Sequence, residues 1–197
     1  MSASTVLCFP WRVIFRYAIW CVVSISLLAS GTAIASEDGA LSESIVEKAR
    51  ISKGLCSVLG CEDVGIGLEL ARSGFFAHVI EPNDSTLQSV QRELLNDKVY
   101  GKQLILDKGS FQSLPYAENS VDLIIATCLT KENLEDLSIS EILRTLRPEG
   151  KAILGSRKSL GESLTPLECK RRLRSENLQN ADYGIDYLST WVQITKP

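Results

Sequence analysis

The chain has 197 residues, of which 45% are hydrophobic and 23% are charged, which is typical of one ordinary globular domain. Its net charge of −3 provides no basic footprint for nucleic acid, so the sequence gives no indication of a DNA- or RNA-binding protein. No internal repeat or low-complexity tract is visible, which argues against a repeat architecture.

The N-terminal segment has the pattern of an export signal. Arg12 and Arg16 precede an uncharged, mostly apolar stretch at residues 17–36, which contains Ala-Ile-Ala at 33–35. A basic region, an apolar region and a small-residue cleavage site in this order predict a secretory signal peptide at residues 1–35. Cleavage would give a periplasmic or secreted protein, residues 36–197, with no stable membrane span. An uncleaved N-terminal membrane anchor is the alternative, because about 20 apolar residues can span a bilayer.

After the signal, segments with helical and strand-like patterns alternate. Ser44 and Glu47 have the spacing of a capping box, which predicts that a short helix begins there and ends before Gly54. Further helices are expected to end at Gly74, to run from about 84 to 96, and to include residues 139–146. The predicted strands lie at residues 55–60, 75–81, 103–106, 121–126 and 151–155.

This alternation predicts an α/β fold: a Rossmann-like, doubly wound, mostly parallel sheet with helices on both faces. The near-continuous apolar run at 121–126 indicates a strand buried on both faces, as in a parallel sheet. A capping box with proline at 165–168 predicts one more helix, to about residue 176. The tail at 183–195 is expected to be strand-rich and to form an antiparallel edge.

Residues 55–81 indicate a nucleotide-binding unit. A strand-like run is followed by a glycine-bearing loop at 60–67, a helical segment and a second strand that ends in Glu81. Such a loop brings backbone N–H groups close to a ligand, and an acid at the tip of the next strand can accept both ribose hydroxyls. An NAD-type site is disfavoured, because Gly65 and Gly67 are followed by Leu70 where the fingerprint has a third glycine.

Three downstream segments narrow the choice of nucleotide. Residues 109–116, 119–124 and 141–151, the last containing Leu-Arg-Pro-Glu-Gly-Lys, resemble the corresponding segments of class I S-adenosylmethionine-dependent methyltransferases, of the methyltransferase type 11 kind. They occur in the family's order and at normal spacing, and the resemblance covers about residues 54–157. It implies that the cofactor is S-adenosylmethionine and that residues 36–197 form a methyltransferase-like domain.

The resemblance also implies roles for individual residues. The loop from Gly60 would approach the methionine part of the cofactor, Glu81 would bind the ribose, and residues 110–111 would lie beside the adenine. Cys128, just after the fourth strand, would face the transferred methyl group and the acceptor, and it can pair with Cys61 across the site. The cofactor-binding positions implied are Gly60, Cys61, Glu62, Gly65, Glu81, Pro82, Ser110, Phe111 and Cys128.

The first loop departs from the family's Gly-x-Gly-x-Gly. Gly60 is followed by Glu62 and Val64 where the pattern has glycine, and a β-branched residue is an outlier at positive φ. Either Gly65 and Gly67 supply the tight turn, or the cofactor pocket has been lost. Ser110 also stands where an aspartate is common.

Two functions therefore remain open. The first is an S-adenosylmethionine-dependent methyltransferase of unknown acceptor, and the second is a catalytically inactive, exported binding or scaffold module with a protein partner. No general base is evident, because the only histidine, His78, lies within a predicted strand and is expected to be structural. Methyl transfer to a good nucleophile can rely on positioning, so this does not exclude an enzyme.

Overall fold

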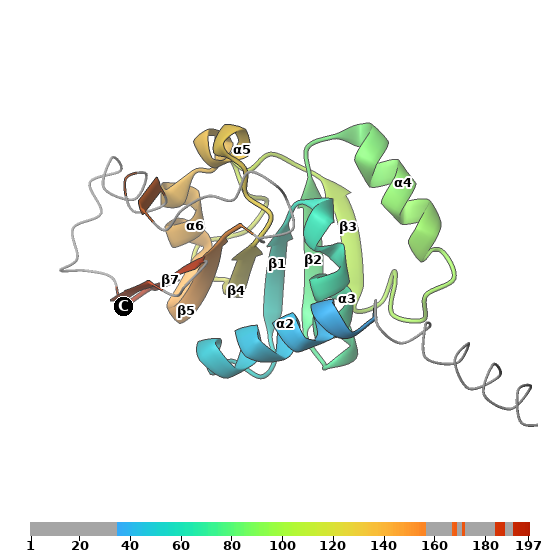
Figure 1. Ribbon diagram of the computed structural model, residues 1–197, viewed down its shortest axis with the longest axis horizontal. Helices are drawn as coiled ribbons and strands as arrows, with labels where there is room; N and C mark the ends of the chain where they lie inside the picture. The colour runs from blue at the N-terminus through green and yellow to red at the C-terminus, as the bar shows by residue number, and fades with distance from the viewer. Residues whose placement is uncertain (1–34, 157–166, 169–170, 172–183, 188–190) are drawn as a thin grey trace, which may run out of the picture. The chain divides into compact units, whose positions relative to one another are not determined.

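The computed structural model describes residues 35–156, 167–168, 171, 184–187 and 191–197. The chain divides into two units, Met1–Glu37 and Asp38–Pro197. The second unit is built around a seven-stranded sheet in the order β3-β2-β1-β4-β5-β7-β6 (Figure 1). Strands β1 to β5 pair in parallel, whereas β5–β7 and β7–β6 pair antiparallel. The predicted doubly wound α/β fold with an antiparallel C-terminal edge is confirmed.

The elements of the described residues have the following bounds. The strands are β1 (Leu55–Leu59), β2 (Phe76–Glu81), β3 (Leu104–Lys108), β4 (Val121–Ala126), β5 (Leu146–Gly155), β6 (Gly184–Tyr187) and β7 (Trp191–Thr195). The helices are α2 (Ala35–Ala49), the 3₁₀ turn η1 (Cys61–Asp63), α3 (Val64–Arg72), α4 (Asp84–Leu94), α5 (Lys131–Asp136) and α6 (Ile139–Thr145).

The two faces of the sheet bury separate apolar clusters. On β4, Leu123 and Ile125 belong to the cluster that includes side chains of α2, α3 and α4, whereas Ile124 and Ala126 belong to the cluster that includes α5 and α6. All four side chains are fully buried. Since successive side chains of a strand point to opposite faces, this alternation explains the continuous apolar run of β4.

Several boundaries differ from those predicted. Helix α2 begins at Ala35, so Ser44 lies inside it rather than at its start. Strand β5 already begins at Leu146, because Leu146 pairs with Val121 before a register shift. The short helix α5 was not predicted, since its polar sequence has no apolar periodicity. Most of the helix expected after Thr165 lies outside the described residues.

Within the described part of the chain, no helix is both long and apolar enough to cross a membrane. The predicted signal peptide, apart from Ala35, lies outside that part.

Candidate functional site

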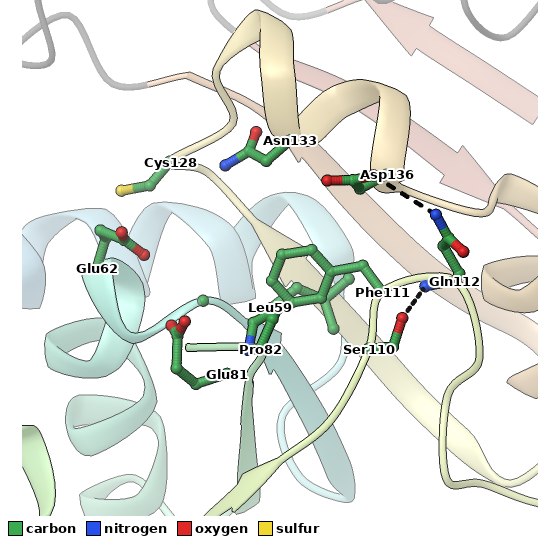
Figure 2. A pocket seen from close by; sticks show the side chains of 11 residues that line it. Leu59, Glu62, Glu81, Pro82, Ser110, Phe111, Gln112, Cys128, Asn133 and Asp136 are labelled. Carbon is green, nitrogen blue, oxygen red and sulfur yellow. Dashed lines mark hydrogen bonds between the residues drawn. The ribbon is translucent and has the colours of Figure 1, made fainter. Parts of the chain in front are cut away.

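A cavity of about 360 Å³ opens at the carboxyl ends of β1, β2, β3 and β4, beside α5 (Figure 2). This is the edge at which open α/β sheets bind ligands, and the volume lies within the range of small-molecule pockets. We call this cavity the cofactor pocket. Its lining consists of Leu59, Gly60, Glu62, Glu81, Pro82, Ser110, Phe111, Gln112, Cys128, Asn133 and Asp136.

The chain turns sharply at Gly60, which lines the cofactor pocket. Its φ of 101° is a backbone conformation that glycine adopts readily and other residues rarely do. Its N–H donates to the carbonyl oxygen of Ile80 at 2.9 Å, which fixes the turn against β2. The chain then makes the single 3₁₀ turn η1 and enters α3 at Val64, whose φ of −58° is ordinary helical geometry. The two missing glycines of the family pattern therefore leave no strain at Val64.

Gly65 and Gly67 do not form this turn. Both lie inside α3, outside the lining of the cofactor pocket. A Cβ on Gly65 would collide with the carboxylate of Asp38 on α2, and a Cβ on Gly67 would touch Val58 of β1 at 3.4 Å. These two glycines thus allow α3 to pack closely on its neighbours.

Glu81 ends β2 and is held in one orientation. It is 6% exposed, its Oε2 accepts a hydrogen bond from the Cys61 N–H at 2.9 Å, and its Oε1 accepts one from the Asn83 N–H at 2.9 Å. Each carboxylate oxygen has two acceptor positions, so one remains on each oxygen. The carboxylate is therefore preorganised to accept two further donors from a ligand in the pocket.

The segment after β3 forms the opposite wall. Phe111 is 7% exposed and packs in the apolar cluster of α5 and α6, while Ser110 is exposed and its Oγ accepts the N–H of Gln112 at 3.1 Å. Nε2 of Gln112 lies 3.5 Å from Oδ1 of Asp136, so this wall reaches α5 (Figure 2). An apolar ring with polar atoms around it can hold a flat heterocycle.

Comparisons with known proteins agree with this geometry. Residues 58–154 match the family described as "Methyltransferase domain", a range from β1 to β5 that contains every residue of the pocket lining. Residues 58–154 form a methyltransferase domain. A comparison with curated proteins gives no match.

Solved structures show the same fold. A protein of Methanococcus maripaludis assigned as an S-adenosylmethionine-dependent methyltransferase has 16% identity and a TM-score of 0.67, over 80% of this chain and 84% of that one. A methyltransferase of Aquifex aeolicus has 12% identity and a TM-score of 0.60, over 79% and 88%. The [4+2]-cyclase SpnF has 20% identity and a TM-score of 0.54, over 75% and 57%. The fold is thus that of S-adenosylmethionine-dependent methyltransferases, and the cyclase shows that fold alone does not fix the reaction.

In this methyltransferase domain a buried aspartate joins two walls of the pocket. Asp63 is fully buried, its Oδ2 accepts the Thr127 N–H at 2.6 Å, and its Oδ1 accepts the Thr127 hydroxyl at 2.8 Å and the Cys128 thiol at 3.0 Å. It connects the turn after β1 with the chain that leaves β4. No sequence pattern pointed to Asp63, and the only available signal was an acidic residue inside the glycine-bearing loop at 60–67.

The two cysteines of the site are not joined by a disulfide. Cys61 is buried, and burial, together with the nearby carboxylates of Glu81 and Glu62, raises the pKa of its thiol to about 12. Cys61 is therefore protonated at neutral pH and is not a nucleophile. Cys128 lines the pocket. Cys61 is not among the lining residues, and its backbone N–H donates a hydrogen bond to Glu81.

The pocket of the methyltransferase domain is acidic. Glu62, Glu81 and Asp136 line it, and no lysine or arginine does so among the described residues. Such a lining favours a ligand that carries positive charge.

His78 lies apart from the pocket and has structural partners. Its Nδ1 is 2.9 Å from the Tyr116 hydroxyl and its Nε2 is 3.1 Å from Oδ2 of Asp107, and the Tyr116 hydroxyl also donates to Ser57 at 3.0 Å. These contacts join β1, β2 and β3 to the loop after β3. The geometry is consistent with the structural role expected of His78.

Proposed function

We propose that this chain is an S-adenosylmethionine-dependent methyltransferase that binds its cofactor in the cofactor pocket. The orientation of Glu81 is the observation that carries the proposal. A buried carboxylate with one open acceptor position on each oxygen, at the tip of the second strand, suits the two hydroxyls of a ribose.

The other pocket residues fit the rest of this cofactor. Leu59, Pro82 and Phe111 offer apolar surface to the adenine, and Gly60 keeps the turn open to the methionine part. The cofactor carries a sulfonium and an ammonium cation against one carboxylate, so its single net positive charge matches the carboxylates of Glu62 and Asp136. The demethylated product has no net charge and gains less from this lining.

The bound cofactor would supply an electrophilic methyl group. The protein's task is then to hold the cofactor and an acceptor nucleophile in line and to exclude water. Cys128 and Asn133, on the α5 side of the pocket, are the side chains placed to contact an acceptor. The Asn133 carbonyl oxygen accepts the Thr130 N–H at 2.6 Å, which leaves its amide hydrogens available to a ligand.

Calorimetric titration of the cofactor and of its demethylated product into the purified protein tests the proposal. We expect micromolar binding. Because hydrogen bonds to a charged group contribute about 1.5–3 kcal/mol each, Glu81→Ala should weaken cofactor binding roughly 10- to 100-fold for each ribose hydrogen bond that is lost. Asp84→Ala, three residues away in an exposed ion pair with Lys108, is the matched control and should bind as the parent does. No binding at millimolar cofactor to a folded sample would refute the proposal.

One observation favours the alternative of an inactive binding or scaffold module. Oε2 of Glu62 lies only 2.9 Å from the position that a Cβ on Gly60 would take, so its carboxylate covers the approach to Gly60. Glu62→Gly uncovers this approach. A gain of cofactor binding from a non-binding parent would support the inactive module, whereas a loss would assign Glu62 to attraction of the cationic cofactor.

We further propose that the protein is exported. Support comes from the pattern of a basic, an apolar and a small-residue region at residues 1–35. After export, the chain would be able to bind a partner protein that is also exported. Expression in a bacterial host, fractionation and intact-mass measurement test this. A periplasmic product that begins at Ser36 is the expected result, a full-length product in the membrane fraction would favour the anchor, and a full-length product in the cytosol would refute export.

A further inference from the structure

A second groove lies at the opposite edge of the sheet from the cofactor pocket, where β1, β2 and β4 begin. It has a volume of about 650 Å³. Its walls come from the loop between α2 and β1, the turn between α3 and β2, and the first residues of β4 and β5. We call it the basic groove, and its lining consists of Arg50, Ile51, Ser52, Lys53, Gly54, Gly74, Phe76, Asp122 and Arg147.

The charge of this groove is opposite to that of the cofactor pocket. Arg50, Lys53 and Arg147 contribute three cations, and among the described residues Asp122 is the only acid in the lining. Both oxygens of Asp122 are already used, since Oδ2 accepts the Leu55 N–H at 2.7 Å and Oδ1 lies 2.6 Å from Nε of Arg147. The remaining positive charge of the groove is therefore not balanced within its lining.

Asp122 also fixes how Arg147 can bind a ligand. It engages the Nε edge of the guanidinium, and Arg147 is still 47% exposed. Among the described residues no other ion pair of Arg147 occurs, so its two terminal nitrogens form a fork that can bind a second oxyanion with two parallel hydrogen bonds. Within the same part of the chain, Arg50 and Lys53 make no ion pair, and both are exposed.

One further feature points to a ligand rather than to solvent alone. Phe76 is 44% exposed, the most exposed phenylalanine among the described residues, and its ring lies in the lining beside the cations. A flat ring and an oxyanion on one molecule would satisfy both the aromatic and the cationic part of the groove.

We propose that the basic groove is a second binding site, for a small ligand that carries a phosphate group and an aromatic ring. Arg147 and Lys53 bind the phosphate, and Phe76 stacks on the ring. This site is independent of the cofactor pocket and of the proposed methyl transfer.

Phenyl phosphate is the probe, and calorimetric titration into the purified protein is the measurement. We expect saturable binding that weakens with added salt, and weaker binding of inorganic phosphate by roughly 2- to 10-fold, since a stacked aromatic pair adds that much. Phe76→Ala should make the two probes equivalent. Equal affinity of both probes for the parent protein would overturn the role of Phe76 and the aromatic ligand with it.

Charge variants locate the phosphate. Lys53→Glu should weaken the binding of phenyl phosphate at least 10-fold. Arg147→Lys keeps the positive charge beside Asp122 but loses the two-nitrogen fork of the guanidinium, so it should also weaken this binding. Lys102→Glu makes the same charge change at an exposed position outside both sites and should have little effect. Equal weakening by Lys102→Glu and Lys53→Glu would overturn the proposal.

Glu81→Ala distinguishes the two sites. It should leave phenyl phosphate binding unchanged, and Lys53→Glu should leave cofactor binding unchanged. Loss of phenyl phosphate binding in a folded Glu81→Ala variant would place the probe in the cofactor pocket and refute a second site, as would absence of binding to the parent at millimolar probe.

Discussion

Asp63 Oδ2 accepts a hydrogen bond from the backbone N–H of Thr127 at 2.6 Å, although the two residues are 64 positions apart in the chain. The contact joins the turn after β1 to the end of β4, the two segments that enclose the cofactor pocket beside Cys128. This buried carboxylate is stabilised by hydrogen bonds from three donors. In turn, it is the buried acceptor that satisfies those donors.

Asp63→Ala should therefore destabilise the protein by roughly 2–4 kcal/mol, because the Thr127 N–H and hydroxyl would lose their buried acceptor. Urea denaturation measures this. Asp84→Ala, which removes only an exposed ion pair with Lys108, should change the free energy of unfolding by about 0.5 kcal/mol or less. A similar small change for both variants would show that Asp63 does not hold the pocket together.

The contrast between Glu81 and Asp63 shows how far the sequence could predict this site. The position of Glu81 in the pocket could be predicted because it depends on local order: a strand, a glycine loop, a helix and a strand that ends in an acid. The role of Asp63 depends on a partner 64 residues away, which no local pattern encodes. The strands were also predicted from local sequence, because a run of apolar residues indicates a buried strand. The short helix α5 was missed because its sequence is polar and has no such pattern.

The turn after β1 was the least predictable part, because the family's glycines suggested that Val64 must adopt a positive φ. The chain instead folds η1 and begins α3 at Val64 with φ −58°. Val64→Gly should therefore not improve cofactor binding. It should lower the free energy of unfolding by about 0.5–1 kcal/mol, the cost of glycine in a helix. Calorimetry and urea denaturation check both parts, and a clear gain of affinity would contradict the observed turn.

Tyr116 joins the loop after β3 to the sheet through its hydroxyl. Tyr116→Phe keeps the ring but removes the partner of Ser57, which is fully buried, and of Nδ1 of His78. We expect a loss of about 1–2 kcal/mol in the free energy of unfolding. Tyr100→Phe is the matched control, because no hydrogen bond of its hydroxyl occurs among the described residues, and it should cost about 0.5 kcal/mol or less. Equal effects would indicate that the Tyr116 hydroxyl contributes nothing.

Glu141 makes the stability of the same loop dependent on pH. Hydrogen bonds from Arg144, at 2.8 Å to each carboxylate oxygen, and one from the Leu114 N–H hold the pKa of Glu141 below its usual value of 4.5. The ionised form is thus favoured in the folded state, so this contribution is complete above pH 4.5 and is lost as the pH falls through the lowered pKa.

Glu141→Gln should reduce stability at pH 7 and should make the difference from the parent shrink in acid, because the parent's carboxylate then becomes protonated. Urea denaturation at pH 7 and at about pH 3 measures this difference. Glu93→Gln, the same substitution at an exposed position of α4, is the control and should change the free energy of unfolding at pH 7 by about 0.5 kcal/mol or less. A difference that stays constant down to the acid end would show that Glu141 acts through its shape and not through its charge.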